Sequence, residues 1–87
     1  MKVKEGFILR TVSDDNLVVP IGDASVDFKS IIKLNETGAF LWKFLEEGST
    51  VDEMTAKMLE EYDADEELIR ADVLAFCEKL EDAGIIE

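Results

Sequence analysis

The sequence contains no histidine and a single cysteine. Without histidine, no Ser-His-Asp or Cys-His arrangement can be built, and the commonest acid–base group and zinc ligand is missing. Cys77 has no partner for an internal disulfide, and the nearby acids Glu78 and Glu81 would raise its pKa. We therefore expect a buried structural thiol in a protein that is not an enzyme and needs no metal or cofactor.

Long apolar runs are also absent. No run approaches the ~20 residues that a membrane helix requires, and residues 1–10 lack the apolar core and cleavage site of a signal peptide. We expect a cytoplasmic protein without membrane contact. The length of 87 residues predicts one domain, 1–87, and an apolar content of 47% argues against disorder.

Basic residues are scarce, with 9 Lys and Arg against 21 Asp and Glu. Residues 1–35 hold five basic and five acidic side chains, so the remainder carries the whole net charge of −12. Such a field repels phosphate, and a glycine-rich phosphate cradle is absent. Nucleic acid is therefore excluded as a direct partner.

Alternating apolar residues predict three antiparallel strands near 7–12, 16–21 and 28–34. The cluster SDDN separates the first two strands and indicates a hairpin. In the third strand, one face carries Phe28, Ile32 and Leu34, and the other carries Lys29, Ile31 and Lys33.

Three helices follow, near residues 36–47, 51–61 and 66–83. Asn35 is a good N-cap for the first helix, and Thr50 with Glu53 forms a capping box for the second. Asp63 or Asp65 caps the third. The core stripe of the third helix is predicted to be Ile69, Val73, Phe76 and Leu80, and the tail after Gly84 is expected to pack back in an extended form.

The first helix is apolar nearly all round, so we expect it to be central, with Trp42 as a core anchor. A three-stranded antiparallel sheet cannot bury its own apolar face. The order of three strands and then three helices therefore predicts an α+β domain in which the helices cover that face.

The stretch IKLNETGAFLWKFLEEGSTVDEM, from Ile32 to Met54, resembles the family of pyrroloquinoline quinone synthesis protein D. The family pattern is a strand ending in Leu-Asn, a helix with Ala and Trp or Leu, and then Gly, Thr and an acidic-apolar pair. The matching positions are Leu34, Asn35, Ala39, Trp42, Leu45, Gly48, Thr50 and Val51. ILRTVSDDNLVVPIG is similar to the family's hairpin, and DVLAFCEKLEDAGII to its last helix and tail.

This resemblance implies a winged-helix-like domain known as a peptide recognition element. Such domains bind the leader segment of a ribosomally made precursor peptide and deliver it to a modifying enzyme, often a radical S-adenosylmethionine maturase. The resemblance also implies that the leader adds as a strand beside the third strand, in a groove against the third helix.

Strand addition uses unpaired backbone groups at an exposed sheet edge, with neighbouring pockets for side chains. If the hairpin places its second strand away from the third, residues 29–33 form such an edge, and their lysines would attract an acidic leader. On the third helix, Leu74 lies ~120° from the core stripe, and the flank with Leu68 and Ala75 is the alternative wall. The predicted peptide-binding residues are Lys29, Ser30, Ile31, Ile32, Lys33, Arg70, Ala71, Leu74 and Glu78.

Two other functions stay open on the sequence alone. One is a protein–protein adaptor without a peptide substrate, and the other is a winged-helix regulatory module. The second would need a basic recognition helix, whereas the third predicted helix is acidic. An open sheet edge is compatible with a monomer or a weak homodimer.

Overall fold

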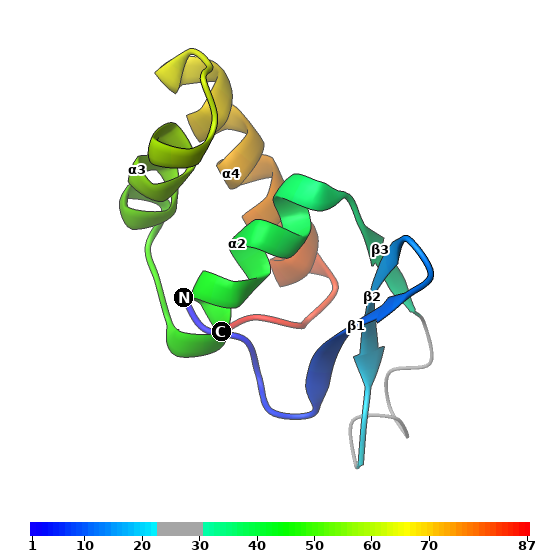
Figure 1. The fold of residues 1–87 in the computed structure, drawn as a ribbon. Helices are drawn as coiled ribbons and strands as arrows, with labels where there is room; N and C mark the ends of the chain where they lie inside the picture. The colour runs from blue at the N-terminus through cyan, green and yellow to red at the C-terminus, as the bar shows by residue number, and fades with distance from the viewer. Residues whose placement is uncertain (23–30) are drawn as a thin grey trace.

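The computed structural model describes residues 1–22 and 31–87 (Figure 1). Its elements follow in the order β1 (Phe7–Val12), β2 (Asp15–Pro20), β3 (Ile32–Leu34), α2 (Glu36–Glu47), α3 (Val51–Glu61) and α4 (Glu66–Asp82). Three antiparallel strands followed by three helices confirm the predicted α+β, winged-helix-like class. None of the described helices is long and apolar enough to cross a membrane.

The hairpin of β1 and β2 turns over two residues, because Val12 lies directly opposite Asp15. Ser13, the first turn residue, has a φ of +56°. A positive φ at the first of two turn residues belongs to the primed turns, whose twist matches that of the flanking strands. The turn fixes the register that sets Leu9 opposite Val18.

The third strand differs from the prediction in extent and in its neighbour. It spans Ile32–Leu34, Ile31 lies outside it, and residues 28–30 of the predicted strand lie outside the described residues. The condition under which the sequence made residues 29–33 an edge, a second strand lying away from the third, is not met, because β2 is the middle strand of the order β1-β2-β3. Among the described strands, β3 is nevertheless at one end of this sheet.

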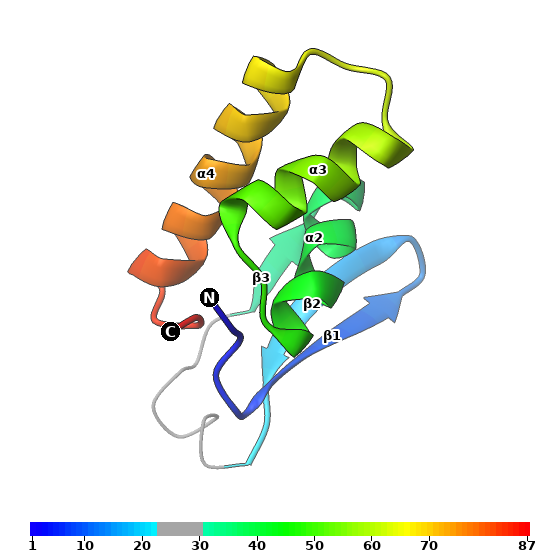
Figure 2. The same ribbon diagram turned by 90° about the vertical axis from the view of Figure 1, so that its left-hand side faces the viewer.

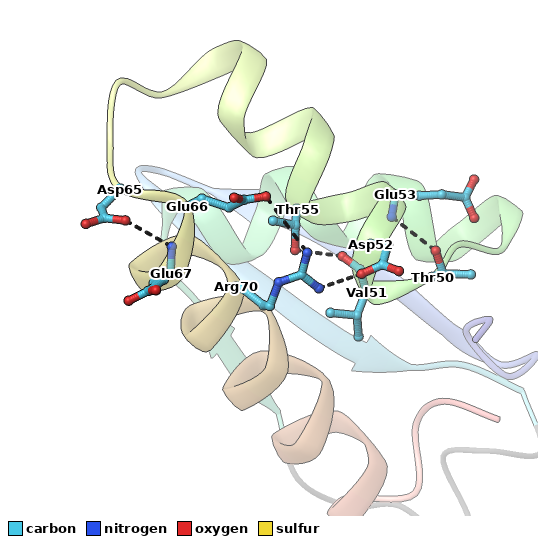
Figure 3. Close-up of polar contacts among 9 residues, drawn as sticks. All are labelled: Thr50, Val51, Asp52, Glu53, Thr55, Asp65, Glu66, Glu67 and Arg70. Atoms are coloured by element: carbon cyan, nitrogen blue, oxygen red, sulfur yellow. Dashed lines mark hydrogen bonds and ion pairs between the residues drawn. The ribbon is translucent and has the colours of Figure 1, made fainter.

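The helices begin at the predicted capping residues. The side chain of Asn35 accepts a hydrogen bond from the Gly38 amide at 2.8 Å. Thr50 accepts one from the Glu53 amide at 3.1 Å, and Asp65 caps α4 through the Glu67 amide at 3.1 Å (Figure 3). Each side-chain oxygen satisfies a donor that the first turn of a helix leaves unpaired.

The helices cover one face of the sheet, and the core lies between this face and the helices (Figures 1 and 2). Trp42 is fully buried, as predicted, together with its helix neighbours Leu41 and Leu45. Phe40 and Phe44, also on α2, are only half-buried and pack edge to face with centroids 5.1 Å apart. Helix α2 thus has one buried stripe and a partly covered aromatic flank.

The buried stripe of α4 differs slightly from the predicted one. Ile69, Val73 and Leu80 are buried as expected, but Cys77 is buried with them and Phe76 is only half-buried. The prediction placed Phe76 in the stripe and Cys77 at its edge. These adjacent residues differ in direction by only ~100° around the helix, so periodicity separates them poorly.

The two ends of the chain lie side by side (Figure 1). The amide of Lys4 donates to the carbonyl of Ile85 at 2.8 Å, and Val3 pairs with Ile86. Ile85 and Ile86 are buried, so the predicted packing of the extended tail is confirmed.

Candidate functional site

The hydrogen-bond direction along β2 follows from its turn. Val12 and Asp15 flank a two-residue loop, and in such a hairpin the flanking residues form the first hydrogen-bonded pair. The odd-numbered residues of β2 therefore bond to β1. One residue past the strand, the amide of Ile21 continues this alternation by donating to the Gly6 carbonyl at 2.7 Å. The even-numbered residues consequently face β3.

β3 therefore has one paired side and one open side. Ile32 and Leu34 lie opposite even-numbered residues of β2, so their backbone groups are directed toward it. Lys33 directs its amide and carbonyl to the opposite, open side. Ile31 lies two residues before Lys33, so the same alternation directs its amide and carbonyl to the open side as well. In the part of the chain that the structure describes, no strand pairs with this open side.

A groove of about 560 Å³ lies beside the end of β3. It is bounded by β3, the first turns of α2 and one flank of α4, with Met58 of α3 at its base. Its lining residues are Lys33, Leu34, Asn35, Thr37, Gly38, Leu41, Met58, Asp72, Ala75, Phe76 and Lys79. The apolar members form a surface on which an apolar side chain can be buried.

The α4 wall and the start of α2 approach each other closely at Gly38. A Cβ at this position would lie 3.3 Å from the Phe76 ring and 3.1 Å from the Asn35 side-chain oxygen. The absence of a side chain therefore lets Phe76 rest against α2 and form the wall of the groove. Asn35 is held by its cap and by a hydrogen bond from the Thr37 hydroxyl at 3.0 Å.

The charges beside the groove come mainly from α4. Within the described residues, neither Asp72 nor Lys79 makes an ion pair, and both are exposed. The ammonium of Lys33 is engaged elsewhere, 3.0 Å from the Asp15 carboxylate. Because its neighbours Ile32 and Leu34 share a sheet face with the fully buried Val18, the side chain of Lys33 projects from the other face, away from the helices. Lys33 thus borders the groove through its backbone and not through its ammonium group.

Comparison with known proteins identifies the family. Residues 22–86 match the sequence model of the family described as Coenzyme PQQ synthesis protein D (PqqD). The chain belongs to this family. The resemblance seen in the sequence is thereby confirmed over most of its length. No curated protein sequence matches the chain with significance.

Two solved structures share the fold of this PqqD-family chain. The first is described as TbiB1 in complex with the TbiA(beta) leader peptide; it has a TM-score of 0.79 and 21% identity and covers 100% of this chain and 95% of that one. The second is lasso peptide synthetase B1 complexed with the leader peptide, with a TM-score of 0.75, 14% identity and coverage of 97% and 93%. At these identities the likeness is one of fold.

The predicted edge residues are placed as follows. Ile31 is 61% exposed, and Ile32 is half-buried toward the helices. Lys33 lies at the open side of β3 and lines the groove. Lys29 and Ser30 lie outside the described residues.

The predicted residues of the third helix do not line the groove. Arg70 forms a hydrogen-bonded ion pair with Asp52 of α3, and this hydrogen bond raises the pKa of its guanidinium (Figure 3). Leu74, which is 44% exposed, lies one turn further along the same flank of α4. Ala71 and Glu78 are exposed on the side away from the core.

The α4 residues that do line the groove belong to the flank that the sequence left as the alternative. They recur at intervals of three and four: Asp72, Ala75, Phe76 and Lys79. Leu68, which is 66% exposed, extends the same row by one turn. This spacing was a usable signal, but it does not show which of the two flanks faces β3.

The titratable groups of the described residues offer little for catalysis. The side chain of Cys77 is buried, and desolvation raises the pKa of its thiol, with the nearby amino terminus opposing this and Glu81 reinforcing it. A thiol held neutral in this way is a poor nucleophile. Among residues 1–22 and 31–87, no three His, Cys, Asp or Glu side chains gather in a way that could hold a metal ion. What the site presents is backbone and a groove with an apolar centre and a charged residue of each sign.

Proposed function

We propose that the chain binds the leader segment of a ribosomally made precursor peptide and presents it to a modifying enzyme. The observation that carries the proposal is the coincidence of an open strand side with a groove directly beside it. The two similarly folded proteins were solved with leader peptides bound, which supports the same class of ligand here. The proposed partner enzyme is a radical S-adenosylmethionine maturase.

The leader adds as a fourth strand next to β3. An added strand lies ~4.8 Å from its neighbour, which places it between β3 and the α4 wall. Ile31 and Lys33 each supply one amide donor and one carbonyl acceptor to it. Alternate side chains of the leader then point into the groove and toward the opposite sheet face. Affinity comes from the main chain, and selectivity comes from the groove.

This mode of binding suits a presenting protein. It fixes a short segment of the precursor and leaves the remainder free to reach the active site of another enzyme. The edge is held by the buried Leu34 and the Asn35 cap, so little ordering of the protein is required when the peptide binds.

Proline substitution at the edge tests the proposal. Ile31→Pro removes one donor and fixes φ, so it should abolish binding of a leader peptide, as measured by titration calorimetry. Thr11→Pro is the matched control, because the amide of Thr11 points away from β2 at the opposite edge of the sheet. Circular dichroism verifies that both variants keep their fold.

N-methylation of the leader tests the same contacts without changing the protein. Methyl groups on the amides that face β3 should remove binding, and those on the alternate amides should not. If a folded Ile31→Pro variant and every N-methylated leader bind normally, strand addition is wrong and the leader binds elsewhere. If the unmodified chain binds no leader at all, the adaptor function takes the place of leader binding.

A further inference from the structure

Two unpaired charges of opposite sign stand on the groove wall. Asp72 and Lys79 both line the groove, and neither has an ion-pair partner among the residues described. They are seven positions apart, which corresponds to about 10.5 Å along a helix. Ala75 and Phe76 lie between them. The wall is therefore acidic, then apolar and then basic in the direction of α4.

The direction in which an added strand runs can be compared with the direction of α4. In both views β3 and α4 run in opposite directions (Figures 1 and 2). A strand antiparallel to β3, which is the slightly more stable pairing, therefore runs in the same direction as α4. Its groove-facing residues recur every ~6.7 Å, so three of them span about 13 Å and cover the separation of the two charges.

On the basis of the proposed function, we infer that the bound segment presents three alternate side chains to the groove that are basic, apolar and acidic from its N- to its C-terminus. The basic side chain meets Asp72, the apolar one is buried against Phe76 and Leu34, and the acidic one meets Lys79. A purely acidic segment fits less well, because the chain carries a net charge of −12 and the Lys33 ammonium is already paired with Asp15.

A display selection tests the inference and does not require the natural leader. A library of random twelve-residue peptides is selected by mRNA display against the full 87-residue chain. Binders that are also retained by a folded Ile31→Pro variant are removed, so that the remaining ones depend on the β3 edge. The best binders are synthesised, and their Kd values are measured by fluorescence anisotropy.

Charge inversion then assigns the contacts. Replacing the acidic peptide residue with lysine should weaken binding to the unmodified chain about three- to tenfold, the range expected for an exposed pair that becomes a repulsion. Lys79→Glu should reverse this preference, and Asp72→Lys should reverse the preference at the basic residue. Glu78→Lys is the control, because it changes charge by the same amount on a face of α4 away from the groove, and it should reverse neither.

The outcomes distinguish failure of the proposed function from failure of the inference. If no binder depends on the β3 edge, the proposed function is wrong. Edge-dependent binders that lack the basic-apolar-acidic alternation, or that show it in the opposite order, overturn the inference and leave strand addition standing. Selected peptides with the stated order and reciprocal charge reversal support the inference.

Discussion

Two substitutions on adjacent residues of α4 distinguish the groove wall from the rest of the helix. Ala75 lines the groove, whereas Leu74 lies on the flank that carries Arg70 and faces α3. Both side chains are exposed, so aspartate at either position can be solvated in the free protein. We predict that Ala75→Asp weakens leader binding strongly and that Leu74→Asp leaves it nearly unchanged.

The magnitude follows from what the groove would bury. Covering one leucine-sized side chain of the leader contributes ~1.5–3 kcal/mol. A carboxylate at position 75 is hydrated and prevents the leader side chain from being buried against this part of the groove. It also lies one helical turn from Lys79, with which it can form an ion pair. Loss of most of this burial free energy corresponds to a rise in the Kd of the leader of about 10- to 100-fold.

Stability should change little in either variant. Aspartate is a poorer helix former than alanine or leucine by ~0.5–0.7 kcal/mol, and Leu74→Asp also loses some packing of a half-exposed side chain. Urea midpoints should therefore move by small and similar amounts. Calorimetric titration of the leader into both folded variants is the deciding assay. Normal binding by Ala75→Asp together with loss of binding by Leu74→Asp would show that the groove lies on the other flank.

Two further predictions concern the core. Trp42→Ala should lower the free energy of unfolding by about 3–5 kcal/mol, because a fully buried aromatic ring is removed; a nearly unchanged urea midpoint would contradict its burial. Burial raises the pKa of the Cys77 thiol, so the unfolded chain ionises first and stability should fall as pH rises above the ordinary thiol value of about 8.5. Cys77→Ser should flatten that decline in urea titrations while lowering stability at neutral pH and leaving leader binding by the folded fraction intact.

The sequence predicted most of the fold because its signals are local. The caps at Asn35, Thr50 and Asp65 depend on side chains within three residues of the amides they satisfy. The hairpin depends on the turn cluster around Ser13, and the faces of each strand follow from alternation. None of these features depends on contacts between residues far apart in the chain.

The groove wall was harder to predict because it depends on tertiary packing. Periodicity identifies the buried stripe of α4 but treats its two flanks as equal. The Arg70–Asp52 pair shows that one flank is directed to α3, and this leaves the other flank to face β3. The order of the strands also depends on tertiary packing, because alternation shows which residues share a face of a strand and does not show which strands are neighbours.

The segment that carries the family resemblance also explains how a small core can support a binding edge. Within five consecutive residues, Leu34 ends β3 as a buried residue, Asn35 caps α2, and Gly38 allows Phe76 of α4 to approach. The open strand and the groove wall are therefore positioned by the same short stretch. In the proposed binding mode the ligand pairs with backbone, so the position of this edge matters more than the chemistry of its side chains. A chain without histidine or reactive thiol can thus be selective through the distance between a strand edge and a helix wall.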